Sequence, residues 1–76
     1  MKIDKYLFQY FNMITEYCME FWKIGYKQMM HLTKKYKLAE LINDNIDYLD
    51  MFGPQSMADI IRECIERDGG SVYELF

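Results

Sequence analysis

The sequence is poor in the residues that build metal centres. It has one histidine, His31, and two cysteines, Cys18 and Cys64, which lie far apart along the chain. Zinc sites draw on clustered cysteine and histidine ligands, often spaced as C-x-x-C, and this spacing does not occur here. The only glycine pair, Gly69-Gly70, is too short to form a phosphate-binding loop. We therefore expect no bound metal and no cofactor.

Long apolar runs are also missing, and we expect no secretory leader. No apolar stretch of the sequence approaches the roughly 18 to 20 residues needed to cross a bilayer. The opening residues Met1–Asp4 lead into an aromatic-rich segment that charges interrupt, which is unlike a leader. We expect a cytoplasmic protein in which Cys18 and Cys64 are reduced core residues.

Activated catalytic groups are scarce as well. A cysteine nucleophile needs a lowered thiol pKa, but Cys18 lies in a bulky apolar segment that would raise it. We predict that the protein is not an enzyme.

Helical periodicity is the main pattern that the chain does contain. Because no segment alternates with a period of two for long enough to form a sheet, we predict an all-α fold. The expected architecture is one small domain over residues 1–76, a bundle of three to four helices with a short C-terminal tail. The helices are expected at about residues 4–23, 26–36, 38–52 and 56–68, with a kink near Asn43–Asn45. Asp4 and Ser56 are the predicted N-caps, and the predicted breaks are Gly25, Gly53-Pro54 and Gly69-Gly70.

The first predicted helix is apolar around more than half of its circumference. A single packed neighbour needs an apolar stripe only about 100° wide. The 76 residues include thirteen aromatic side chains and seven methionines, so some of these must remain exposed or enter a partner. We expect a homodimer or a hetero-complex. The central seam of this helix is predicted at Leu7, Phe11, Ile14, Cys18 and Phe21.

Charge divides the chain into two halves of opposite sign. Residues 1–37 carry seven lysines and three acids, whereas residues 38–76 carry two arginines and nine acids. One interpretation is that the halves attract each other within the fold or across a dimer. The alternative function is nucleic-acid binding, although the basic segment lacks the arginine that base recognition favours. Its candidate residues are Lys27, Lys34, Lys35 and Lys37.

Four carboxylates recur at helical spacing in the acidic half. A metal cluster would need ligands converging from facing helices, and no Glu-x-x-His motif or calcium-loop pattern is present. We interpret the acids as a solvated ridge beside an apolar strip, a surface that would dock a basic partner. The carboxylates are Glu40, Asp44, Asp47 and Asp50, and the strip consists of Leu41, Tyr48, Leu49, Met51 and Phe52. The predicted partner-binding residues are Asp44, Asp47, Tyr48, Leu49, Asp50 and Phe52, with the aromatic residues as anchors and the acids as steering charges.

Three stretches of the chain share a pattern with other short helical proteins. Tyr17–Glu20 reads tyrosine-cysteine-apolar-glutamate, Lys27–Leu38 includes lysine-tyrosine, and Met57–Arg67 carries paired isoleucines after an aspartate-rich segment. With these features, residues 17–68 resemble a family of short bacterial all-helical proteins of unassigned function. Genes of that family often lie beside toxin-like genes, including ADP-ribosyltransferase-like ones. The resemblance therefore implies an antitoxin-like or immunity-like partner of a toxin-like enzyme.

Overall fold

Four helices make up the described part of the chain, which confirms the predicted all-α bundle. The computed structural model describes the backbone of residues 5–75 and the side chains of residues 9–75. The helices are α1 (Lys5–Trp22), α2 (Tyr26–Lys35), α3 (Leu38–Asp44) and α4 (Ile46–Arg67). The predicted cap Asp4 and the side chain of Leu7 lie outside the described residues.

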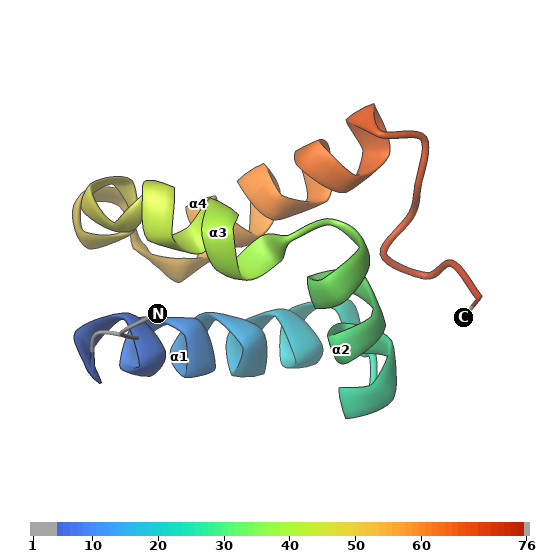
Figure 1. The fold of residues 1–76 in the computed structure, drawn as a ribbon, viewed down its shortest axis with the longest axis horizontal. Coiled ribbons are helices and arrows are strands. Elements are labelled where there is room, and N and C mark those ends of the chain that lie inside the picture. The colour runs from blue at the N-terminus through green and yellow to red at the C-terminus, as the bar shows by residue number, and fades with distance from the viewer. Residues whose placement is uncertain (1–4, 76) are drawn as a thin grey trace.

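The helices form two layers (Figure 1). The long α1 forms one layer, α3 and α4 lie together against it, and α2 closes one end by packing on both α1 and α3. The chain after α4 returns past α2 to the C-terminus. No helix within residues 5–75 is both long enough and apolar enough to cross a membrane.

A left-handed lysine, rather than a glycine, ends α1. Lys23 has φ 57°, and the N–H of Ile24 donates to the carbonyl of Met19 at 3.0 Å, which is the six-to-one bond of a Schellman motif. Gly25, the predicted break, instead begins α2 as its N-cap, with φ −86°. The sequence predicted the end of this helix within a few residues. It assigned the break to Gly25, whereas the left-handed residue is Lys23.

Asn45 separates α3 from α4. Its backbone N–H donates to the carbonyl of Ile42 at 3.1 Å, and its side-chain Nδ2 donates to the carbonyl of Leu41 at 2.7 Å. Both bonds satisfy carbonyls at the end of α3 that have no partner within the helix. The predicted kink is therefore in the right place, but it divides the expected helix over residues 38–52 into two.

Gly53 interrupts α4 in the middle of its course. Its φ of 84° and ψ of 175° are accessible to glycine and strained for other residues. Pro54 resumes the helix at a first-turn position, where its missing N–H removes no hydrogen bond. The break at Gly53-Pro54 is as predicted, whereas the predicted N-cap Ser56 is wrong because the residue lies inside the helix.

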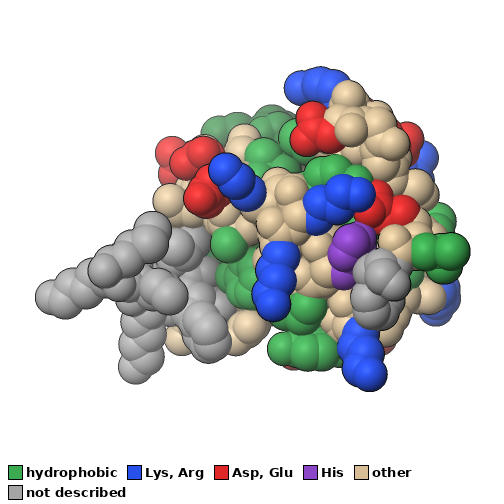
Figure 2. All heavy atoms as spheres, turned by 45° about the vertical axis from the view of Figure 1, so that its right-hand side comes forward, with side chains coloured by type: hydrophobic (Ala, Val, Ile, Leu, Met, Phe, Trp, Pro, Cys, Tyr) green, Lys and Arg blue, Asp and Glu red, His purple; other side chains and the backbone are tan. Residues whose placement is uncertain are grey.

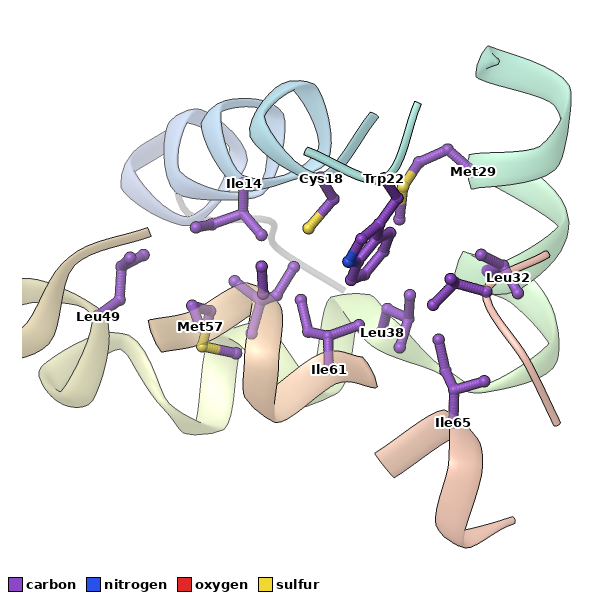
Figure 3. Close-up of a cluster of buried hydrophobic side chains, with 13 residues drawn as sticks. Ile14, Cys18, Trp22, Met29, Leu32, Leu38, Leu49, Met57, Ile61 and Ile65 are labelled. Atoms are coloured by element: carbon purple, nitrogen blue, oxygen red, sulfur yellow. The ribbon is translucent and has the colours of Figure 1, made fainter. Parts of the chain in front are cut away.

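The core is built where the two layers meet (Figure 3). In α1 the buried row is Ile14, Cys18 and Trp22, whereas Phe21, predicted to lie in the central seam, is exposed. These three residues are four apart, and residues at that spacing form a ridge inclined to the helix axis. The other helices pack along this ridge and bury it. The facing side chains come from all the other helices and from the tail: Met29, Leu32, Leu38, Ile42, Leu49, Met57, Ala58, Ile61, Ile65 and Val72.

Candidate partner-binding surface

The predicted partner-binding residues lie around the junction of α3 and α4. Asp44 is the last residue of α3, and Asp47, Tyr48, Asp50 and Phe52 occupy the first two turns of α4. The structure thus brings these residues to one end of the bundle, where helical spacing distributes them over different faces of α4.

Leu49 does not belong to the exposed surface. Its side chain is 3% exposed and points into the core, where Figure 3 shows it near Ile14 and Met57. The reason is positional, because Leu49 is the residue of this turn that faces α1. Its predicted role as a partner-binding residue is therefore corrected to packing in the core.

An apolar patch does lie on the outer side of the same turns. Met51 is 75% exposed and Phe52 is 56% exposed. The rings of Tyr48 and Phe52 pack with their centroids 4.6 Å apart and their planes tilted by 40°. Because Tyr48 lies three residues before Met51 and four before Phe52, the three share one face of the helix. We call these three residues the apolar patch.

The acids next to this patch differ in how firmly they are held. Asp44 and Asp47 are not buried. Asp50 is exposed, but it accepts a 2.6 Å hydrogen bond from the hydroxyl of Tyr10 on α1. Asp50 therefore joins α4 to α1, while Asp44 and Asp47 are exposed on either side of the α3–α4 junction.

The four lysines of the candidate nucleic-acid face differ in their contacts. Lys27, Lys34 and Lys37 are exposed, and Lys27 and Lys34 lie seven residues apart on one face of α2. Lys35, in contrast, has its Nζ 2.7 Å from Oε2 of Glu74. The candidate nucleic-acid face thus has one of its four charges paired with the chain's own C-terminal segment.

Glu74 is the centre of a polar cluster that the sequence did not predict. His31 Nε2 lies 2.9 Å from Oε2 of its carboxylate, and the hydroxyl of Tyr36 donates to Oε1. Figure 2 shows this end of the molecule, with the single histidine in purple beside an acidic side chain. With Lys35, three side chains of the α2 segment thus converge on one carboxylate.

These donors change the ionisation of the cluster. The hydrogen bond from Lys35, followed by those from Tyr36 and His31, holds the pKa of Glu74 well below its usual range. The hydrogen bond with Glu74 raises the pKa of both Lys35 and Tyr36. Glu74 is therefore a carboxylate at neutral pH, and the cluster is a charge-assisted contact.

The backbone of the C-terminal segment is held as well. We call Ser71–Leu75 the tail. Gln28 Nε2 donates to the carbonyls of Val72 at 3.0 Å and of Glu74 at 2.6 Å. Val72 is buried in the core between these contacts. Ser71–Leu75 is therefore docked on α2.

One local pattern contributes to this arrangement. Ser71–Glu74 has the Ser-x-x-Glu spacing of a capping box, and it forms local bonds typical of a helix start. Glu74 Oε1 accepts from the N–H of Ser71 at 3.1 Å, and Ser71 Oγ accepts from the N–H of Tyr73 at 3.1 Å. No helix follows within the described residues, and the glutamate is used to dock the tail instead.

Comparisons with known proteins add no assignment to this geometry. No family model, no curated protein and no solved structure matches the chain. The resemblance of residues 17–68 to a family of short bacterial helical proteins stays a prediction. Within the described part of the chain, histidine, cysteine, aspartate and glutamate side chains form no group of three that could hold a metal ion.

Proposed function

We propose that this protein is a small, non-enzymatic interaction module that binds a basic surface of another protein. The contact surface consists of the apolar patch of Tyr48, Met51 and Phe52, with Asp44 and Asp47 beside it. The observation that carries the proposal is the exposure of Met51 and Phe52 on an ordered helix whose neighbouring residue, Leu49, is fully used in the core. Exposed apolar side chains next to charges are typical of interaction sites.

The patch has the composition of an interface centre. Aromatic residues and methionine are enriched at protein interfaces, and large anchors contribute most of the binding energy. The Tyr48–Phe52 ring contact holds both rings in place before binding, which lowers the entropy lost on association. Asp44 and Asp47 would accelerate encounter with a positively charged partner and would orient it.

Charge distinguishes a different partner from a second copy of this chain. In a symmetric dimer the same patch meets itself, so Asp44 and Asp47 would approach the corresponding acids of the other copy. Like charges brought together at an interface cost free energy. The patch is therefore better suited to a basic partner than to self-association, and the proposal commits to a hetero-complex.

The resemblance noted in the sequence supports a more specific version. An antitoxin-like or immunity-like protein would act in the cytoplasm by covering a basic cleft of a toxin-like enzyme. If a toxin-like gene lies beside this one, expressing this chain together with that gene should protect cells from the toxin-like enzyme. Reversing the charge of Asp44 and Asp47 should abolish that protection. Nucleic-acid binding through Lys27, Lys34 and Lys37 is the competing outcome, which salt-sensitive electrophoretic retardation would reveal.

Site-specific photocrosslinking in cells tests the proposal with a partner of any identity. A benzophenone amino acid is placed at Met51 or Phe52, and at exposed Glu63 on the same helix as the matched control. We expect a protein adduct from the two patch positions and none from Glu63, and we expect its loss in the Asp44→Lys, Asp47→Lys variant. Equal crosslinking at all three positions, or none at the patch, would count against the proposal.

A further inference from the structure

The α2 segment presents polar side chains toward the tail in a regular arrangement. Gln28, His31 and Lys35 are spaced by three and four residues, so they follow one face of the helix. Tyr36, the C-cap residue of α2, adds its hydroxyl at the end of that row. We call these four residues the tail site. It lies at the α2 end of the bundle, away from the start of α4 (Figure 1).

The tail site contacts its occupant in two distinct ways. Gln28 donates to two backbone carbonyls, a contact that any extended peptide could make. His31, Lys35 and Tyr36 contact the Glu74 carboxylate, which only an acidic side chain can supply. Main-chain bonds that give affinity, combined with side-chain selection, are the features of peptide-recognition sites.

The tail, which occupies this site, lies on the surface of the bundle and buries little of itself. Only Val72 of the tail is buried, whereas Tyr73 is 63% exposed and Leu75 is 96% exposed. Gly69, with φ 85°, and Gly70 connect it to the end of α4. A segment with so few buried apolar contacts opens at a lower free energy than the core does.

We propose that the tail site is a receptor for extended acidic segments of the form apolar-x-Glu, and that the tail is a built-in competitor for it. Opening of the tail would expose the apolar surface that Val72 now covers. It would also release the side chains of His31, Lys35 and Tyr36 from Glu74. A segment of the same chemistry from another chain could then take both positions. The tail site is basic and would bind an acidic ligand. The apolar patch has Asp44 and Asp47 beside it and would bind a basic one, so the two surfaces would select different ligands.

Competition with the tail sets how strongly an external segment binds. A tethered ligand acts at an effective concentration in about the millimolar range. The apparent affinity of a free peptide is its intrinsic affinity multiplied by the fraction of molecules whose site is open. A variant with a displaced tail and an intact tail site should therefore bind the peptide better than the wild-type chain does.

Gly70→Ala is such a variant. A β-carbon at this position would overlap the Tyr36 phenol and would lie 2.6 Å from Oε1 of Glu74. Glu74→Gln, which weakens the tail's own side-chain contact, is the second variant. Both variants contain all 76 residues and keep the four residues of the tail site, and circular dichroism checks that each remains helical.

The test measures fluorescence anisotropy of a labelled synthetic peptide with the sequence GGSVYELF. We expect the Gly70→Ala and Glu74→Gln chains to bind it about tenfold or more tightly than the wild-type chain does. Replacing the glutamate of the peptide by glutamine should weaken binding to both variants by about tenfold, because charge-assisted bonds are lost. Absence of binding to both variants, or equal binding of the two peptides, would overturn the proposal. Because these variants leave the apolar patch unchanged, this outcome is independent of the proposed function.

Discussion

The phenol of Tyr36 lies directly above the Cα of Gly70, where a methyl group would overlap it. This contact explains why a glycine stands at position 70, since Gly70 itself has no left-handed φ to account for it. It also places the Tyr36 hydroxyl where it donates to Glu74. The absence of a side chain at Gly70 thus lets Tyr36 pack against the end of α4 and at the same time hold the tail through Glu74.

Gly70→Ala should therefore release the tail. Forcing a methyl group into packed surroundings costs about 1–3 kcal/mol, and the short tail can relieve the overlap by leaving α2. We expect amide exchange to accelerate at Glu74, whose N–H donates to the carbonyl of Ser71 at 3.1 Å. Exchange in the middle of α1 should stay unchanged. Unaltered protection of the tail would contradict the close contact with Tyr36.

The ionisation of Glu74 gives the docked tail a defined dependence on pH. Because the folded pKa is depressed, the contact's stabilisation is complete above the unfolded pKa of about 4.3. It is lost only as pH falls below that value toward the folded pKa. Docking of the tail should thus weaken progressively over that range, while Glu74 in the docked tail stays ionised at pH values where an ordinary glutamate is protonated. Carboxyl chemical shifts of Glu74 measure this directly.

Removing the donors provides the control for that titration. In a Lys35→Met, Tyr36→Phe chain the carboxyl loses its two largest pKa-lowering contacts. The pKa of Glu74 should move up toward its ordinary value, and tail protection should be lost at a higher pH than in the wild type. An unchanged titration curve would show that these two side chains do not hold the carboxylate.

The correction of Leu49 leads to a stability test of the surface assignment. Leu49→Ala should lower the free energy of unfolding by about 2–5 kcal/mol, because it leaves a cavity in the core. Met51→Ala, two residues away, should change it by less than about 0.5 kcal/mol, because its side chain is exposed. Urea unfolding monitored by circular dichroism compares the two. Similar effects at both positions would place Met51 in the core.

The two cysteines should differ in reactivity. Cys18 is fully buried, and its burial raises the pKa of its thiol to about 12. The thiolate is the reactive form, so iodoacetamide should modify Cys18 far more slowly than half-buried Cys64 in the native protein. Mass spectrometry of timed samples measures both rates, which should converge after denaturation. Fast native labelling of Cys18 would mean that α1 does not pack as described.

Local sequence signals were sufficient for much of the fold. Polar spacing predicted the first two helices closely, and the poor helix formers near Asn45 and the Gly53-Pro54 pair predicted the two breaks in the second half, because each signal acts over a few residues. The expected helix over residues 38–52 is nevertheless two helices. The buried row of α1 required tertiary information. Trp22 and Phe21 are neighbours on a helix that is apolar on most sides, so only the crossing direction of the other helices decides which one is buried.

The same limit applies to the surfaces. Helical spacing predicted that Asp47, Tyr48 and Phe52 would lie close together, but it could not show that Leu49 faces the core. The tail site joins residues about forty positions apart in the sequence, and such pairings follow from the fold rather than from local pattern. The division of charge between the halves of the chain did anticipate attraction within the fold, and the Lys35–Glu74 ion pair is one contact of that kind.

The most direct test of the proposed interaction surface is a methyl NMR titration of the chain labelled at its methionine methyl groups. The probe is a basic amphipathic leucine-lysine peptide, which has the chemistry the proposed partner surface requires. The Met51 methyl signal should shift saturably and less at high salt, while those of buried Met29 and Met57 should stay in place. The shift should disappear in the Asp44→Lys, Asp47→Lys chain. An unmoved Met51 signal, or an equal shift in the charge-reversed chain, would contradict the assignment of this surface.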